Sequence, residues 1–309
     1  MIVVTGGAGF IGINFVKLLL DNRWAQPHEI LVIDKLTYAS NESAVRKLGV
    51  NLAVVDIADK NELFAELSKH DVYGIINFAA ESHVDRSIED CTPFVYSNII
   101  GTINLLEYIR SCEHWDTIRF LQVSTDEVFG QVLDGSFTEQ SPLQPRNPYS
   151  ASKASAEHFV NAYATTHKLN TVIVNCCNNY GPYQNEEKLI PKAISLIKQG
   201  EPVPLYGYGQ QIREWIYVED AVRAIYKILI KGKRGQKYCI GSGEELTNNQ
   251  LVKFIGETLE LDANIKYVED RKGHDARYCI DSTKLRALGW HTKVSFQEGL
   301  KNTIEWMNK

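Results

Sequence analysis

The chain has 309 residues, a formal net charge of −5 and 44% hydrophobic residues. This length is sufficient for a large buried core and for two lobes. The mildly acidic balance argues against a general affinity for nucleic acid or for an anionic membrane, so an anionic ligand would need a local site. No apolar run approaches the roughly 20 residues that a membrane-spanning helix requires.

The cysteine pattern and the N-terminus both favour a cytoplasmic protein. Cys176 and Cys177 are neighbours, but the six cysteines form no Cys-x-x-Cys motif and no Cys/His spacing typical of zinc. The chain starts directly with the apolar run Ile2-Val3-Val4, without a charged leader, so we expect no signal peptide. We therefore expect reduced, buried thiols and no metal site.

The first two-thirds of the chain alternate short β-branched runs with longer amphipathic stretches. This pattern predicts strands at residues 2–5, 30–33, 52–55, 74–78, 118–124 and 171–176, with helices between them. Nearly continuous apolar strands in such an alternation are typical of a parallel sheet covered on both faces. The predicted fold class is α/β: a doubly wound (Rossmann) parallel sheet with a smaller C-terminal lobe.

Beyond residue 176 the alternation loosens, and Gly and Pro cluster at 178–182 and 202–209, which indicates loops. A helix is expected after Val218, and capping boxes at Thr247-x-x-Gln250 and Ser295-x-x-Glu298 predict two more. We predict that residues 1–176 bind a dinucleotide and that 210–240 return to this domain. Residues 177–209 and 241–309 are predicted to form the substrate-binding lobe.

Gly6, Gly9 and Gly12 follow the first predicted strand and precede a helical pattern. Glycines allow a tight turn and close approach of a pyrophosphate, and the helix N-terminus supplies free N–H groups. Asp34, at the end of the second strand, would accept hydrogen bonds from a ribose and repel a 2′-phosphate, which predicts NAD rather than NADP. The neighbouring Lys35 weakens this preference for NAD, because its positive charge would tolerate a 2′-phosphate. Asp56 is either an adenine contact or an ordinary solvated residue.

Tyr149 and Lys153 are four residues apart and hence lie on one helix face. A neighbouring ammonium would lower the phenol pKa from about 10 and make Tyr149 a usable base. Thr125, Asp126 and Glu127 leave the fifth strand, where ligands bind in open α/β sheets. Two adjacent carboxyls could be solvated loop residues. In a desolvated cleft, however, their pKa values would separate into those of an acid and a base.

Several motifs resemble those of dTDP-glucose 4,6-dehydratases, which are extended short-chain dehydrogenases. They lie at residues 6–12, 34–39, 77–88, 124–130, 149–153, 178–183, 188–191, 213–218 and 270–275. The resemblance extends from Met1 to the C-terminal helix. Together these motifs separate this family from related short-chain dehydrogenases.

The resemblance implies a reaction cycle in which bound NAD is consumed and regenerated. Tyr149 would take the proton of the sugar 4-hydroxyl while a hydride passes from C4 to NAD. Lys153 would tune the phenolate, and Thr125 would hydrogen-bond the 4-oxygen. Glu127 would then remove the C5 proton while Asp126 protonates the departing 6-hydroxyl. Return of the hydride to C6 would give a 4-keto-6-deoxy sugar.

The resemblance also implies binding residues. Those expected to contact NAD are Gly6, Gly9, Phe10, Ile11, Gly12, Asp34, Lys35, Thr37, Asp56, Ile57, Phe78, Ala79, Ala80, Ser82, Asn98, Val123, Tyr149, Lys153 and Asn179. Those expected to contact the nucleotide sugar are Ser82, Thr125, Asn178, Lys188, Leu189, Pro204, Tyr206, Arg213, Asn248, Arg271 and His274. The planar guanidinium groups of Arg213 and Arg271 suit a diphosphate. A homodimer through helices at 149–166 and 102–110 is also expected.

Some positions depart from the family pattern and leave alternatives open. Asn175-Cys176-Cys177, Tyr208, Lys272 and Ala276 differ on the nucleotide side, so UDP-glucose or another nucleotide hexose is an alternative substrate. A UDP-sugar decarboxylase or 4-epimerase is less favoured, because decarboxylases carry a serine at the position of Asp126 and epimerases lack the Asp–Glu pair. A catalytically silent NAD-binding regulator is disfavoured by the intact catalytic residues.

Overall fold

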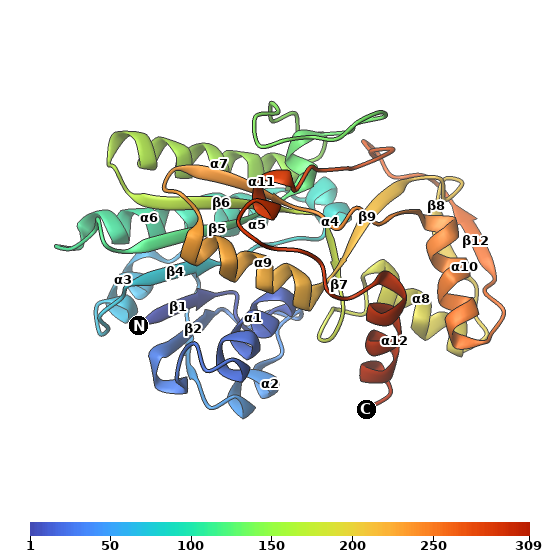
Figure 1. Ribbon diagram of the computed structural model, residues 1–309, viewed down its shortest axis with the longest axis horizontal. Helices are drawn as coiled ribbons and strands as arrows, with labels where there is room; N and C mark the ends of the chain where they lie inside the picture. The colour runs from blue at the N-terminus through green and yellow to red at the C-terminus, as the bar shows by residue number, and fades with distance from the viewer.

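The computed structural model describes all 309 residues and is built around a seven-stranded parallel sheet (Figure 1). The strand order is β10-β6-β5-β4-β1-β2-β3. The strands are β1 (Ile2–Thr5), β2 (Ile30–Asp34), β3 (Asn51–Val54), β4 (Gly74–Asn77), β5 (Arg119–Thr125), β6 (Asn170–Cys176) and β10 (Gln236–Ile240). The six predicted strands are confirmed, and their ends differ from the prediction by at most one residue.

Helices cover both faces of this sheet, because successive strand residues point to opposite sides. Val3, Leu31 and Ile75 pack under α3 (Lys60–Leu67), α6 (Gly101–Ser111) and α7 (Pro148–Thr166). Val4 and Val32 pack on the other face with α1 (Phe10–Asp21), α9 (Val218–Lys231) and the shorter α2 (Glu42–Lys47) and α11 (Thr283–Arg286). The predicted doubly wound α/β class is confirmed.

Short helical segments connect these layers. A 3₁₀ turn, η1 (Pro27–Glu29), precedes β2, and another, η3 (Asp126–Phe129), follows β5. The helices α4 (Val84–Glu89) and α5 (Thr92–Phe94) follow β4, and a π-helical turn, η2 (Val95–Ile100), joins α5 to α6. π-Helical turns are rare and are frequent at functional sites.

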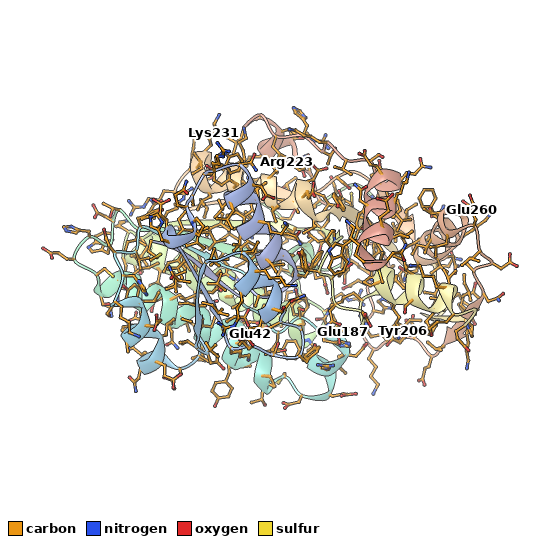
Figure 2. All side chains as sticks on the ribbon, turned by 90° about the horizontal axis from the view of Figure 1, so that it is seen from below. Glu42, Glu187, Tyr206, Arg223, Lys231 and Glu260 are labelled. Atoms are coloured by element: carbon orange, nitrogen blue, oxygen red, sulfur yellow. The ribbon has the colours of Figure 1, made fainter.

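A smaller part of the molecule has its own core and lies at the right of Figure 1. It contains a three-stranded sheet of β11 (Glu245–Thr247), β9 (Ile212–Tyr217) and β7 (Asn178–Tyr180). It also contains the parallel pair β12 (Ile265–Val268) and β8 (Val203–Tyr206). Its helices are α8 (Leu189–Lys198), α10 (Asn248–Leu259) and α12 (Phe296–Met307). Figure 2 labels Glu42 on α2 in the large part and Glu260, which follows α10, at the far side of the smaller part.

The chain crosses between the two parts more than once. The helix expected after Val218 is α9, which packs with α1, and β10 then joins the large sheet beside β6. Thr247 and Gln250 form both hydrogen bonds of the expected capping box at α10. The second expected box, at α12, is only half formed: Ser295 accepts from the N–H of Glu298 without a reciprocal bond. None of the helices combines the length and the apolar character needed to cross a bilayer.

A buried polar network joins the carboxyl ends of the central strands. Thr5 Oγ1 donates to Asn77 Oδ1 at 2.6 Å, and Asn77 Nδ2 donates to Gln122 Oε1 at 2.9 Å. All three residues are buried, where unpaired polar groups would be strongly destabilising. The network therefore aligns β1, β4 and β5 at the edge from which their loops leave.

Candidate active site

A cleft of about 300 Å³ lies at the carboxyl ends of β1, β4, β5 and β6. The expected site residues that line it are Gly6, Gly9, Phe10, Ile11, Gly12, Thr37, Phe78, Ala80, Ser82, Val123, Thr125, Asp126, Glu127, Tyr149, Lys153, Asn178, Asn179 and Lys188. A hollow of about 100 Å³ continues past the ends of β2 and β3, and its lining adds Asp34, Lys35, Asp56, Ile57 and Ala79. Residues far apart in the sequence thus share one surface.

The glycines between β1 and α1 are required by close backbone packing. Gly6 has a φ of +65°, and a Cβ there would lie 2.6 Å from the backbone N of Ala79. A Cβ on Gly12 would lie 2.3 Å from the carbonyl O of Gly6. No side chain caps the first turn of α1, which begins at Phe10, and no acidic residue lies in that turn. Its N–H groups and the positive end of its dipole therefore remain available at the cleft.

Asp34 fastens the glycine loop to the end of β2. Its Oδ2 accepts from the N–H of Ala8 at 3.0 Å, and two further donors from the following loop bind its Oδ1. Lys35 points elsewhere: its Nζ lies 3.3 Å from Glu81 Oε1 and 3.8 Å from Asp56 Oδ2. The carboxylate of Asp34 therefore faces the hollow without a direct ion pair to Lys35.

The end of β5 places two carboxyl groups in the cleft. Thr125 Oγ1 accepts from the N–H of Glu127 at 3.3 Å and donates to Asp126 Oδ1 at 3.2 Å. This contact caps η3, so both acids lie in its first turn. Asp126 is 2% exposed, and its Oδ2 has no hydrogen-bond partner. A buried carboxyl with so few donors is stabilised in its neutral form.

The two carboxyl groups have different electrostatic surroundings. Burial raises the pKa of Asp126 well above its ordinary range, and the charge of Glu127 raises it further. Burial also raises the pKa of Glu127, but the charges of Arg213, Arg271 and Lys188 act in the opposite direction. The neutral form is thus favoured at Asp126, while three cations support the ionised form of Glu127. Such a difference is the expected property of an acid–base pair.

The helix α7 begins at a well-defined cap that fixes its first turn. Asn147 Oδ1 accepts from the N–H of Ser150 at 2.8 Å, and Pro148 occupies the first helical position, where its missing N–H is tolerated. The N–H of Tyr149 donates to Ser87 Oγ of α4 at 3.1 Å. Tyr149 is therefore held on the cleft side of the helix.

Lys153 and Tyr149 line the cleft from the same face of α7, as the spacing predicted. Lys153 Nζ donates to the carbonyl O of Val123 at 2.7 Å, and burial lowers its pKa to about 8. We expected this ammonium to lower the pKa of Tyr149. Instead, burial raises the pKa of Tyr149, and the charge of Glu127 acts in the same direction. Burial disfavours the phenolate, so the expected lowering of this pKa does not occur.

Eight of the expected binding residues line neither the cleft nor the hollow, and three of them pack elsewhere in the fold. Asn98 is buried in η2, where its Nδ2 donates to the carbonyl O of Glu81 at 3.0 Å and to Ser152 Oγ at 2.8 Å. It braces the loop after β4 instead of facing the cofactor side. Leu189 packs against the core of the smaller part, and Pro204 lies within β8, opposite a residue of β12.

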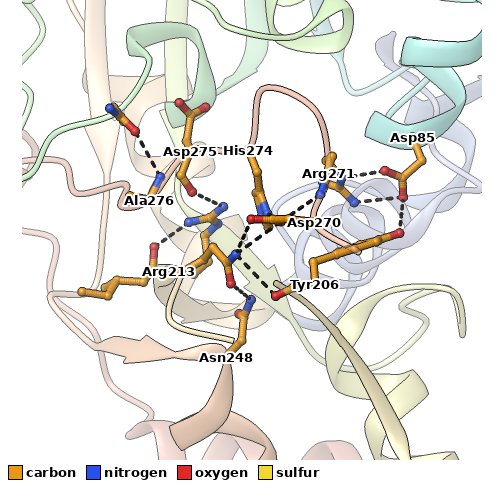
Figure 3. A network of polar contacts seen from close by, with 12 residues as sticks. Asp85, Tyr206, Arg213, Asn248, Asp270, Arg271, His274, Asp275 and Ala276 are labelled. Carbon is orange, nitrogen blue, oxygen red and sulfur yellow. Dashed lines mark hydrogen bonds and ion pairs between the residues drawn. The ribbon is translucent and has the colours of Figure 1, made fainter. Parts of the chain in front are cut away.

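The remaining expected substrate residues belong to a polar network that joins the two parts (Figure 3). Arg271 Nε lies 2.6 Å from Asp85 Oδ1, and its Nη2 donates to Asp85 Oδ2 at 2.9 Å. The hydroxyl of Tyr206 donates to the same Oδ2 at 3.0 Å. Arg213 is buried and lies 4.2 Å above the ring of Tyr278. Both guanidinium groups are thus held in defined orientations.

His274 and Asn248 lie in the same network. His274 Nδ1 is 2.7 Å from Asp270 Oδ1, and Asn248 Nδ2 donates to Gln211 Oε1 at 3.4 Å. Burial lowers the pKa of His274, although Asp270 opposes this effect. Asn248 Oδ1 is buried and has no hydrogen-bond partner, so the network keeps an acceptor for a further donor.

Sequence reasoning did not single out several residues of these networks. Asp85 belongs to the 77–88 motif, but its partner Arg271 lies 186 residues away, and no spacing rule connects them. Glu187, labelled near the junction of the two parts in Figure 2, lines the cleft and accepts from the hydroxyl of Tyr38 at 3.0 Å and from Arg86 at 3.3 Å. The signal available for Glu187 was its position next to Lys188.

Comparisons with known proteins agree with this geometry. The family model described as GDP-mannose 4,6 dehydratase matches residues 3–303. A low-salt glycan biosynthesis protein, Agl12 of Haloferax volcanii, is 47% identical over 99% of this chain and 97% of its own length. The dTDP-glucose 4,6-dehydratase of Haemophilus influenzae is 44% identical over the same shares of the two chains.

The similarity extends to solved structures. The crystal structure of DesIV, a dTDP-glucose 4,6-dehydratase from Streptomyces venezuelae with NAD and TYD bound, superposes with a TM-score of 0.94 at 42% identity. The match covers 99% of this chain and 96% of that one. The motifs, the doubly wound sheet and the full-length similarity lead to one conclusion: the chain belongs to the dTDP-glucose 4,6-dehydratase family.

Proposed function

We propose that this chain is an NAD-dependent nucleotide-sugar 4,6-dehydratase, with dTDP-glucose as the first candidate substrate. The observation that carries the proposal is the pair of enclosed carboxyls, Asp126 and Glu127, in one cleft with Tyr149 and Lys153. Elimination of water needs an acid and a base that act on neighbouring atoms. The same cleft offers both, together with a phenol and an ammonium suited to oxidation of an alcohol.

The residues of the cleft fit NAD. The glycine loop leaves no room for side chains at Gly6 or Gly12, and the uncapped first turn of α1 offers N–H donors suited to a pyrophosphate. Asp34 adds a carboxylate beside the hollow, where it would accept from ribose hydroxyls and repel a 2′-phosphate. NAD, when bound, supplies a hydride acceptor and later a hydride donor.

Around the sugar, Tyr149 takes the proton of the 4-hydroxyl as C4 is oxidised. Lys153, charged below a pKa of about 8, stabilises the phenolate that Tyr149 needs for this step. Thr125 hydrogen-bonds the 4-oxygen, because its hydroxyl lies at the end of β5 beside both acids. The 4-keto group that results makes the C5 proton acidic.

The elimination uses the two carboxyls in different states. Glu127, ionised with the help of nearby cations, removes the C5 proton. Asp126, kept neutral by burial, donates its proton to the departing 6-hydroxyl as water. Each such proton transfer contributes roughly 10²–10⁴-fold to the rate. Return of the hydride to C6, with return of the proton from Glu127 to C5, would complete a 4-keto-6-deoxy sugar.

For the nucleotide part of the substrate, we propose that Arg213 and Arg271 bind the diphosphate and that Tyr206, Asn248 and His274 surround the nucleoside. The fork of a guanidinium matches phosphate oxygens, and both arginines already have fixed orientations. The departure at Cys177 lies in the cleft itself, while Tyr208 contacts Asn249 and Lys272 follows Arg271. UDP-glucose or another nucleotide hexose is therefore the second candidate. A decarboxylase is disfavoured by Asp126 itself.

We propose that residues 1–176 form the NAD-binding domain and that 177–209 with 241–309 hold the nucleotide sugar. Within the returning segment 210–240, α9 and β10 pack with the large sheet, which supports this division. The strand β9 does not, because it pairs with β7 and β11. The return to the NAD-binding domain therefore starts with α9, at Val218.

We place the protein in the cytoplasm. All six cysteines are free thiols, and Cys176, Cys177 and Cys239 are buried as expected, whereas Cys91 is exposed. An exposed free thiol is compatible with a reducing compartment, where glutathione and thioredoxin keep cysteines reduced.

The first prediction concerns turnover. Incubation with dTDP-, UDP-, CDP- and GDP-glucose should give a 4-keto product from at least one of them, detected by alkali-induced absorbance and by a mass loss of one water. We expect dTDP-glucose to have the highest kcat/KM. Release of carbon dioxide from a UDP-uronate, with no keto product from any of the four, would contradict the proposed function.

The second prediction separates oxidation from elimination. Glu127→Gln should slow exchange of the C5 proton with solvent deuterium by about 10²–10⁴-fold, since the base is lost. Oxidation at C4, followed by the absorbance of reduced nicotinamide, should persist. The exposed Glu113→Gln serves as the control and should exchange as the wild type does. Wild-type exchange in Glu127→Gln would remove that residue from the base role.

The third prediction tests the protonation of Asp126 through stability. Burial raises its pKa, so the folded chain keeps the proton of Asp126 to a higher pH than the unfolded chain, whose pKa is about 3.9. This contribution to stability therefore falls as pH rises above about 4. Asp126→Asn removes the loss, so the Tm of this variant relative to the wild type should rise as the pH increases above about 4, and level off once the folded carboxyl ionises. The exposed Asp116→Asn should show no such trend.

The fourth prediction concerns a homodimer, which we propose to form through α7 and the adjacent η2; the helix expected at 102–110, α6, has most of its residues buried within the chain. Val95, Tyr96 and Phe159 are exposed on these adjacent elements, and grouped exposed apolar side chains mark interaction surfaces. Sedimentation equilibrium should give twice the mass of the chain. Phe159→Glu should shift it toward the monomer, whereas a wild type that sediments as a monomer would refute the dimer.

A further inference from the structure

A carboxylate that the proposed chemistry does not use lies fully buried behind the cleft. Glu157 is on α7, one turn beyond Lys153, and its side chain has no solvent exposure. Its Oε1 accepts from Ser124 Oγ at 2.5 Å and from Asn175 Nδ2 at 2.7 Å. Its Oε2 lies 2.5 Å from Lys237 Nζ. Buried charges are stable only when they are paired and hydrogen-bonded in this way.

The partners of Glu157 come from three strands. Ser124 is in β5, Asn175 is in the neighbouring strand β6, and Lys237 is in β10 at the edge of the sheet. Asn175 Nδ2 also donates to the carbonyl O of Thr125 at 2.9 Å. One carboxylate thus connects α7 to the last residues of β5 and β6 and to the returning segment of the chain.

These contacts lie directly behind the residues that face the substrate side. Ser124 and Thr125 immediately precede the two acids, and Lys153 Nζ donates to the carbonyl O of Val123 at 2.7 Å. The helix α7 is therefore attached to two successive residues at the end of β5, Val123 and Ser124. Any shift of α7 along β5 would separate the phenol and the ammonium from the acids.

Few titratable groups surround Lys153. On α7 they are Tyr149 and Glu157, on β6 Cys176, and on η3 Asp126 and Glu127. Lys237 on β10 is the cation that contacts Glu157, and the side chains at the carboxyl end of β5, among them Ser124, are neutral. Burial is the main cause that lowers the pKa of Lys153, and the charge of Glu157 is the largest cause that opposes it.

We propose that Glu157 is a positioning residue of this enzyme: it fastens α7 to the ends of β5 and β6, and so holds Tyr149 and Lys153 opposite the two acids. The inference rests on the proposed function for its catalytic consequence. Lys237 completes the arrangement by neutralising the carboxylate from β10. A second role follows from the geometry, because the negative charge supports the ammonium one turn away.

The test uses two variants that break the same ion pair in the full-length protein. Glu157→Gln removes the negative charge near Lys153, whereas Lys237→Met leaves that charge in place. The pKa of Lys153 is measured by NMR of ¹³Cε-labelled lysine, with its signal assigned by comparison with Lys153→Arg. We expect a lower pKa for Lys153 in Glu157→Gln than in the wild type, and no lowering in Lys237→Met.

Steady-state kinetics provide the second measurement. Glu157→Gln should lower kcat by about 10- to 100-fold with little change in KM, because misplaced groups slow the reaction more than they weaken binding. Asp220→Asn is the matched control: Asp220 is also buried on a helix and paired with an arginine, Arg223, but it lies on α9 outside the cleft. Its kcat should stay within about twofold of the wild type.

The outcomes separate the two proposals. An unchanged pKa of Lys153 in Glu157→Gln, or a loss of kcat no larger than that of an equally destabilised Asp220→Asn, would overturn the positioning role. If Glu157→Gln does not fold, Glu157→Gln/Lys237→Met carries no unpaired charge and replaces it in both measurements. If the wild type converts no nucleotide sugar, the proposed function fails, and the NMR titration alone decides the role of Glu157.

Discussion

Asp126 and Glu127 are adjacent in the chain and share one water-poor site at the end of β5, and the rest of the site is arranged around this crowding of two acids. In water both carboxyls would ionise near pH 4. Here burial penalises both charges, and the charge of Glu127 further disfavours ionisation of Asp126. The cost of ionisation is reduced unequally. The positive charges of Arg213, Arg271 and Lys188 stabilise the ionised form of Glu127, whereas Asp126 Oδ2 has no hydrogen-bond partner.

That inequality depends on the way the two parts of the molecule meet. The three cations come from the smaller part or from the segment that leads into it, while the acids belong to the large sheet. Arg271 reaches across to Asp85, and Lys188 Nζ donates to the carbonyl O of Ser82 at 3.0 Å. The contacts that join the two parts thus also place positive charge near Glu127. Arg271 and Lys188 therefore both hold the two parts together and favour the ionised form of Glu127.

Much of the fold was predictable because it follows from local patterns. The alternation of apolar runs located six of the seven strands of the large sheet, and the cap residues at Thr247 located the start of α10. The strand that the sequence did not predict is β10, which lies in a region without a clear apolar pattern. Its place beside β6 depends on the return of the chain from the smaller part to the large sheet. The incomplete cap at Ser295 shows that a matching tetrapeptide does not ensure both hydrogen bonds.

The site was predictable in composition but not in its electrostatics. The glycine loop, Thr125, the acid pair and the Tyr149–Lys153 spacing indicated the chemistry, and all of them line one cleft. The pKa of Tyr149 is raised and not lowered as expected, because a four-residue spacing does not reveal how deeply the phenol is buried. Asn98 was assigned to the cofactor, yet its side chain braces a loop.

The sequence by itself determined which residues carry the chemistry and on which strand ends they stand, since periodicity and motif spacing act over a few residues. Only the tertiary structure decided which of them are desolvated and which charges face one another. Asp85 with Arg271, and Glu157 with Lys237, are partners across 186 and 80 residues of chain. Their pairing follows from how the two parts fold back on each other, and no local spacing encodes it.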